Sequence, residues 1–128
     1  MRALLISLAL TAMLLSGCGT PAPTTPTPTP PPISPEEQKL QEQRYTFIQD
    51  MIAEGIFLKV EQPADFPHVW VTSVFYALNF EDKQAFISVV YAYYSTQDPE
   101  ADMVVLYDSK TGKKVGVFAE VYGGLKLD

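Results

Sequence analysis

Apolar and polar positions follow a helical period in the first part of the region from residue 34 onward. The apolar residues with helical spacing are Leu40, Phe47, Ile48, Met51 and Ile52, with Tyr45 at the edge of the stripe. This spacing predicts an amphipathic helix over 35–54. Ser34 and Pro35 suit the start of that helix, and Glu37 stands three residues after Ser34, as in a capping box. Gly55 is a natural stop.

After Gly55 the period shortens, and runs rich in Val, Phe, Trp and Tyr predict strands. The run 84–94 has apolar residues on both faces, which is typical of a central strand. Short turns between the strands favour antiparallel pairing. The predicted strands are 56–60, 68–80 with a bend or bulge at Thr72–Ser73, 84–94, 103–107 and 115–122, and residues 125–127 are a candidate for one further short strand after Gly123–Gly124. The predicted fold is α+β, with one N-terminal amphipathic helix packed on a curled antiparallel sheet of four to five strands.

The start of the chain has the layout of a secretory signal. Arg2 supplies a positive charge, and residues 3–15 are apolar apart from Ser7 and Thr11. The apolar run of about 13 residues is shorter than the roughly 20 residues that a spanning helix needs. We therefore expect residues 1–17 to be a signal peptide outside the fold.

Leu15, Ser16, Gly17 and Cys18 resemble the lipobox of bacterial lipoproteins, in which Leu, a small residue and Gly or Ala precede Cys. The resemblance implies cleavage before Cys18, a thioether-linked diacylglycerol on its sulfur and acylation of the new amino group. The residue that follows is Gly19 rather than Asp. By the sorting rule of this family, that residue favours the outer membrane where the organism has one. The alternative is an ordinary secretory signal followed by a free cysteine.

Residues 19–32 consist almost entirely of proline and threonine. Proline lacks a backbone donor and fixes φ, so the tract favours extended polyproline II. At about 3.1 Å per residue it reaches on the order of 40 Å. The predicted organisation is a signal at 1–17, lipidated Cys18 with a tether at 18–33, and a domain at 34–128. O-glycosylation of the threonines and passage through a cell-wall mesh remain alternatives to a plain spacer.

The chain has 9 basic and 15 acidic residues and a formal net charge of −6. An acidic chain without a cluster of Lys or Arg argues against nucleic acid as a partner and against adsorption to anionic lipid. Cys18 is the only cysteine, so its lipidation leaves none for a disulfide.

Candidate chemistry is sparse, and we predict no catalytic residue, no metal site and no cofactor. His68 is the only histidine, and no serine has the glycine context of a nucleophile elbow. The alternating acids of 98–102 lack the central Gly and terminal Glu of a calcium loop. The lysines of 110–114 lack the Gly-x₄-Gly-Lys-Ser/Thr pattern of a phosphate loop. A hydrolase that uses His68 with carboxylates is the weakest of three hypotheses.

Aromatic residues crowd the region 70–94, and one helix can cover only one face of a sheet. An uncovered aromatic face marks a binding site or an oligomer contact. The candidate binding surface consists of Trp70, Tyr76, Tyr91 and Tyr93.

In size, anchor and element order, the chain resembles small envelope lipoproteins accessory to outer-membrane barrel assembly, but it lacks their second helix and their Gly-rich helix-turn motif. The resemblance implies only the class of protein. We expect a lipid-anchored, non-enzymatic envelope protein that binds another envelope protein. The alternative is a module that binds a small molecule, a peptide or a glycan on an aromatic sheet face.

Overall fold

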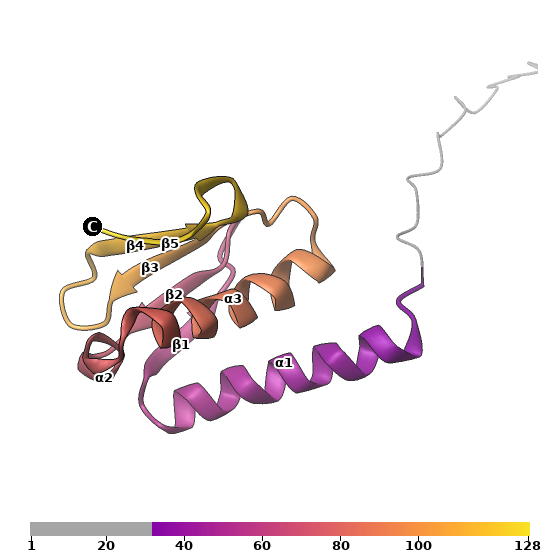
Figure 1. Cartoon of the computed structure of the whole chain (residues 1–128), viewed down its shortest axis with the longest axis horizontal. Helices are drawn as coiled ribbons and strands as arrows, with labels where there is room; N and C mark the ends of the chain where they lie inside the picture. The colour runs from indigo at the N-terminus through magenta and orange to yellow at the C-terminus, as the bar shows by residue number, and fades with distance from the viewer. Residues whose placement is uncertain (1–31) are drawn as a thin grey trace, which may run out of the picture. The chain divides into compact units, whose positions relative to one another are not determined.

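The computed structural model describes residues 32–128. The predicted signal peptide, Cys18 and all but the end of the tether lie outside the described residues. The elements in chain order are α1 (Pro35–Ala53), β1 (Phe57–Glu61), β2 (His68–Val71), α2 (Ser73–Ala77), α3 (Phe80–Gln97), β3 (Val104–Asp108), β4 (Lys114–Ala119), the 3₁₀ turn η1 (Glu120–Tyr122) and β5 (Gly124–Leu127) (Figure 1). No described helix is both long enough and apolar enough to cross a membrane.

The described region is an α+β fold with one mixed sheet of five strands in the order β1-β2-β3-β4-β5. Neighbouring strands pair antiparallel except β2 and β3, which are parallel. The prediction of a purely antiparallel sheet was therefore wrong. Its physical cause is the helical segment between β2 and β3, because a crossover of this kind carries the chain back to the end of the sheet at which β2 begins, so that β3 runs in the same direction.

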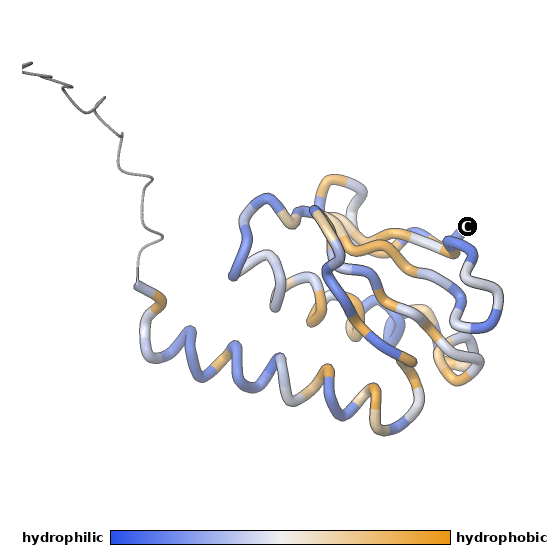
Figure 2. Tube along the Cα trace, turned by 180° about the vertical axis from the view of Figure 1, so that it is seen from behind, coloured by the Kyte–Doolittle hydropathy of each residue, from blue (hydrophilic) through white to orange (hydrophobic). Residues whose placement is uncertain are grey.

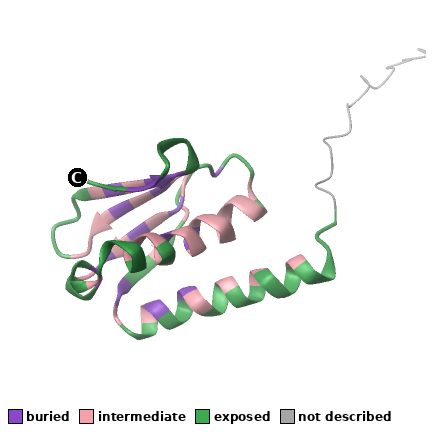
Figure 3. Ribbon diagram, viewed as in Figure 1, coloured by how far each residue is buried: buried purple, intermediate pink, exposed green. Residues whose placement is uncertain are grey.

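Helix α1 coincides with the helix predicted over 35–54. The side chain of Ser34 accepts a hydrogen bond from the backbone N–H of Glu37 at 3.2 Å, and Pro35 occupies the first turn. Gly55, at φ 75°, follows the helix. Only Ile48 and Met51 of this helix are buried, so α1 is held mainly through its second half (Figure 3).

The predicted central strand over 84–94 is wrong, because these residues belong to helix α3. Helix α3 contacts α1 as well as β3, β4 and β5. Most of its length is half-buried (Figure 3). A helix between two other layers is apolar on more than one face, and that pattern resembles the two-sided apolar pattern of a central strand.

The predicted strand over 68–80 is also wrong beyond Val71. Thr72 caps α2, since its hydroxyl oxygen accepts a hydrogen bond from the N–H of Val74 at 3.2 Å. The same hydroxyl donates to the carbonyl of Ile56 at 3.1 Å. The expected bend is thus the start of a short helix, which buries Phe75 completely.

The hydrophobic core lies between the sheet and the helices. Alternate residues of β2 and β3 are fully buried, and they meet apolar residues of α1, α2 and α3. Buried core residues include Ile48, Met51, Phe57, Val69, Val71, Phe75, Ile87, Val90, Val104, Leu106, Phe118 and Leu125. Figure 2 colours each residue by its hydropathy, and the first half of α1, which contributes no buried residue to this core, is mostly hydrophilic.

Residues 108–113, which separate the predicted strands 103–107 and 115–122, form the hairpin between β3 and β4. A carboxylate oxygen of Asp108 accepts hydrogen bonds from the N–H groups of Lys110 at 2.8 Å and Thr111 at 2.7 Å. Gly112 takes φ 69°, in the left-handed region that favours glycine. The strand predicted over 115–122 ends earlier, at Ala119, where η1 begins.

Candidate functional site

The side of the sheet that faces away from the core carries a continuous set of side chains that we call the open face. Strand register places them in two rows across the sheet, because paired residues point to the same side. One row is Glu61, His68, Val105, Val117 and Lys126, and the other is Lys59, Trp70, Tyr107 and Lys114. None of these nine residues is buried, whereas their neighbours Val69, Leu106 and Phe118 are.

An aromatic cluster occupies the centre of the open face. The rings of Trp70 and Tyr107 are stacked, with centroids 5.3 Å apart and an interplanar angle of 23°. His68 lies 5.7 Å from Trp70 and 4.9 Å from Tyr107, with both rings tilted against it. Offset stacking of this kind stabilises aromatic pairs beyond the area that they bury.

Lys59 completes this cluster from the neighbouring strand. Its Nζ lies 4.2 Å from the centroid of the Trp70 ring, a cation–π distance, and 3.2 Å from Oε1 of Glu61. Strands β1 and β3 flank β2 on opposite sides, and Lys59 and Tyr107 reach the Trp70 ring from these two strands. Both groups therefore occupy space beside the ring that a stacking ligand would need.

The charge of the open face differs in sign from that of the chain. It holds Lys59, Lys114 and Lys126 but only one acid, Glu61, in a chain whose formal net charge is −6. Helix α1, by contrast, carries four acidic residues, and its C-cap is a fifth. The four are Glu36, Glu37, Glu42 and Asp50, and the C-cap is Glu54. The distribution makes the open face a positive region on an acidic protein.

The structure does not bring the four predicted surface residues together. Trp70 lies on the open face, Tyr76 on α2, and Tyr91 and Tyr93 on α3. Tyr91 packs beside Phe118, with centroids 5.3 Å apart, at the core side of the sheet. Only Trp70 therefore belongs to the site described above.

Tyr76 has a structural contact of its own. Its hydroxyl donates to Oδ2 of Asp108 at 2.9 Å and so joins α2 to the β3–β4 hairpin. Burial, followed by the bond to Asp108, raises the pKa of Tyr76 to about 12. Hydrogen bonds from the backbone of Thr111 and from Tyr76 lower the pKa of Asp108.

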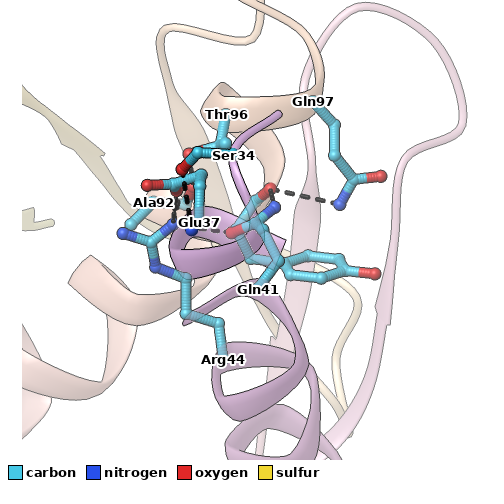
Figure 4. Close-up of polar contacts among 8 residues, drawn as sticks. Ser34, Glu37, Gln41, Arg44, Ala92, Thr96 and Gln97 are labelled. Atoms are coloured by element: carbon cyan, nitrogen blue, oxygen red, sulfur yellow. Dashed lines mark hydrogen bonds and ion pairs between the residues drawn. The ribbon is translucent and has the colours of Figure 1, made fainter. Parts of the chain in front are cut away.

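A polar network joins α1 and α3 (Figure 4), and the backbone carbonyl of Tyr93 takes part in it. Nη1 of Arg44 donates to Glu37 at 2.9 Å, to Gln41 at 2.6 Å and to Thr96 at 3.3 Å. Nε2 of Gln41 donates to the backbone carbonyl of Tyr93 at 2.9 Å. These bonds hold the thinly buried first half of α1 against α3.

Two shallow grooves lie outside the open face. One, of about 540 Å³, is lined by Gln41, Glu42, Tyr45, Thr46 and Tyr93. The other, of about 580 Å³, lies between the start of α3 and the β4–β5 connection and includes Phe80, Gln84, Phe118 and Gly124. Within residues 32–128, no three His, Cys, Asp or Glu side chains are grouped to hold a metal ion.

Sequence reasoning missed most of the open face. Alternation in 68–71 places Trp70 on the same side of its strand as His68, but the apolar run 103–107 does not assign Tyr107 to a side. The contact between Trp70 and Tyr107 depends on the parallel pairing of β2 with β3. The prediction of a strand over 84–94 excludes that pairing, because it removes the helical crossover between β2 and β3.

Comparison of the chain with protein-family models, with curated proteins and with solved structures found no match. The open face is therefore the basis on which a function can be inferred.

Proposed function

We propose that this protein is a lipid-anchored bacterial cell-envelope protein whose domain is a non-enzymatic module that binds another envelope protein. The observation that carries the proposal is the uncovered aromatic cluster of His68, Trp70 and Tyr107 on the open face. Trp and Tyr are the residues that most often dominate the energetics of protein interfaces. A five-stranded sheet also supplies a rigid platform, which lowers the entropic cost of binding.

The sequence supports the anchor. The lipobox-like residues 15–18 follow an apolar run and place the lipid on Cys18. Two or three acyl chains hold a protein stably on a membrane, since each buried CH₂ contributes roughly 0.8 kcal/mol. Gly19 after the cysteine favours the outer membrane in bacteria that have one.

Membrane attachment is tested by Cys18→Ser. This change removes the sulfur that would carry the lipid, and we expect the protein to move from the membrane fraction to the soluble fraction of a cell lysate. A matched control is Ser16→Ala, which keeps a small residue in the lipobox. If the Cys18→Ser protein stays with the membranes, the anchor assignment is wrong.

Partner binding is tested by photo-crosslinking in cells from an unnatural amino acid placed at Val117, in the middle of the open face. The control position is Gln43, which is exposed on α1. We expect one dominant crosslinked protein from position 117 and none in comparable amount from position 43. Equal crosslinking from the two positions, or none from position 117, contradicts the proposal.

The second candidate is a module that binds a small molecule, a peptide or a glycan on the same aromatic face. The cluster of three rings favours it, because aromatic residues also line ligand sites. The contacts of Lys59 and Tyr107 with the Trp70 ring weigh against the stacking of a glycan on it, since these side chains would have to move. Two results together would favour this candidate. Position 117 would give self-crosslinks and no other crosslinks, and a screened compound would bind saturably to the parent but not to a Trp70→Ala, Tyr107→Ala variant.

The non-enzymatic part of the proposal is tested at His68. A hydrolase of the kind considered for this sequence depends on this imidazole, since His68 is the chain's only histidine. His68→Phe removes the imidazole but keeps an aromatic ring in the cluster with Trp70 and Tyr107, and we expect this variant to fold and to retain the cellular function of the parent. A folded His68→Phe protein that still crosslinks from position 117 but fails to restore a deletion strain would point to chemistry at His68.

A further inference from the structure

The lysines of the open face are arranged around its aromatic cluster. Lys59 lies on edge strand β1, Lys114 on β4 and Lys126 on edge strand β5, so positive charges flank His68, Trp70 and Tyr107 on both sides. All three lysines are exposed. We propose that the open face binds an acidic segment of its partner protein, an inference that rests on the function proposed above and specifies the chemistry of the partner.

The argument is one of charge complementarity. Opposite potentials on two interface surfaces steer association and fix the register of the complex. Helix α1 and its C-cap carry five acidic residues against Lys39 and Arg44, so α1 repels an acidic partner on balance, whereas the open face attracts one. The separation of positive charge on the open face from negative charge on α1 also orients the partner as it approaches.

Lys59 shows how the aromatic cluster prepares the site. The ring of Trp70 and the carboxylate of Glu61 hold its ammonium group at 4.2 Å and 3.2 Å. A carboxylate of the partner can join Glu61 around the same cation, while the ring edges of Trp70 and Tyr107 contact the partner's apolar atoms. Holding a flexible lysine in advance reduces the side-chain entropy lost on binding.

A protein segment fits this surface better than a membrane or a polysaccharide. The residues at the centre of the open face are only half-exposed, and none of them is among the strongly exposed large apolar residues that could enter a bilayer. Three lysines attract an anionic membrane only weakly. A sugar ring would need a free aromatic face, and Lys59 and Tyr107 already contact the Trp70 ring.

Trp70 is the only tryptophan, so its fluorescence reports directly on the open face. The probe is a poly-glutamate peptide, titrated into the full chain carrying Cys18→Ser. We expect a saturable change in Trp70 emission at low salt and at least fivefold weaker binding at 150 mM salt, because the Debye length shortens to about 8 Å. Poly-lysine of the same length serves as the control peptide and should produce no saturable change.

Two charge-matched variants locate the binding surface. Lys114→Glu with Lys126→Glu reverses two charges on the open face and leaves Lys59 against Trp70. Lys39→Glu with Lys83→Glu reverses two charges on α1 and α3, away from that face. We expect the first variant to bind poly-glutamate about tenfold more weakly and the second to stay within twofold of the parent.

The inference is overturned if poly-glutamate leaves the emission unchanged at low salt, or if the two variants lose affinity equally. It is also overturned if vesicles of phosphatidylglycerol bind through Lys114 and Lys126 while poly-glutamate does not, since the face would then be a membrane contact. The proposed function fails separately. If the crosslinked partner from position 117 persists in the Lys114→Glu, Lys126→Glu variant, the interaction module stands and only its acidic partner is wrong.

Discussion

The contact between Tyr76 and Asp108 shows how one hydrogen bond changes two titrations in opposite directions. The phenol donates and the carboxylate accepts, so the bond favours neutral Tyr76 and charged Asp108. The pKa of Tyr76 rises to about 12, and that of Asp108 falls. The bond therefore stabilises the fold at pH values between the lowered pKa of Asp108 and the raised pKa of Tyr76. Its contribution is lost as the pH falls through the lowered pKa of Asp108, and again as the pH rises from the ordinary tyrosine value toward 12.

Tyr76→Phe tests this contact. We expect the pKa of Asp108 to rise part of the way to its ordinary value, because the bonds from Lys110 and Thr111 remain. The measurement is an NMR titration of the Asp108 carboxyl carbon. Tyr122→Phe, at another partly exposed tyrosine, is the control and should leave the Asp108 titration unchanged. An unchanged Asp108 titration in Tyr76→Phe would show that the phenol has no part in the shift.

Gly116 is a residue whose small size the sheet requires. A Cβ at this position would lie 2.6 Å from the backbone carbonyl oxygen of Lys126 and 3.0 Å from a methyl carbon of Leu127. A backbone atom in a paired strand cannot move aside as the end of a flexible side chain can. The close approach of β5 to β4 thus depends on glycine here.

We expect Gly116→Ala to destabilise the domain by about 1–3 kcal/mol, the usual range for overpacking. The measurement is urea unfolding followed by Trp70 fluorescence. Lys114→Ala, at an exposed position of the same strand, is the control and should change the free energy of unfolding by less than about 0.5 kcal/mol. Equal stability of Gly116→Ala and the parent would mean that β5 can shift away at no cost.

At the scale of elements, α3 shows where sequence patterns lose information. Its residues are β-branched or aromatic at many positions, and its layer is apolar on both sides because α1 and the sheet enclose it. Periodicity cannot separate such a helix from a buried strand. The stronger signal was local, since Asn79 and Asp82 stand three apart, as the residues that cap a helix do.

The caps explain why some elements could be predicted and others could not. Ser34 with Glu37 is a clear signal, because a capping residue coincides with the start of a helical period. Glu81 and Asp82 lie between the predicted strands 68–80 and 84–94, where a turn is expected, although acidic residues also suit the positive end of a helix. The prediction of antiparallel pairing throughout depends on treating 84–94 as a strand. The parallel pairing of β2 and β3 instead requires α3 as part of its crossover.

The cap of α3 gives a prediction at this scale. The Oδ1 of Asn79 accepts from the N–H of Asp82 at 2.8 Å, and its Nδ2 donates to Oδ2 of Asp82 at 2.8 Å. We expect Asn79→Ala to cost about 1 kcal/mol of stability, measured by thermal and urea unfolding. Ser88→Ala, in the interior of the same helix, is the control and should be neutral or slightly stabilising. A loss in Ser88→Ala as large as that in Asn79→Ala would contradict the role of the cap.

At the scale of the whole molecule, one sheet separates two chemical environments. On one side, the apolar rows of the strands pack against α1, α2 and α3. On the other, lysines and aromatic rings stay open to solvent while most acids lie on the helices and loops. The sequence contains all of these charges, but only the strand register shows that three lysines share a face.

The proposed function also gives a role to the predicted tether, which under that proposal sets how far from the membrane the open face can act. A polyproline II segment of about 14 residues spans roughly 43 Å at 3.1 Å per residue, whereas a Gly/Ser segment of equal length spans only about 20 Å. We therefore expect replacement of residues 19–32 by Gly and Ser to lower the crosslinking yield from position 117 at unchanged membrane attachment. A flexible chain gains reach only as the square root of its length, so a Gly/Ser segment about four times longer should restore the yield. An unchanged yield with the short Gly/Ser segment would mean that the partner lies close to the membrane and that the stiffness of the tether serves another purpose.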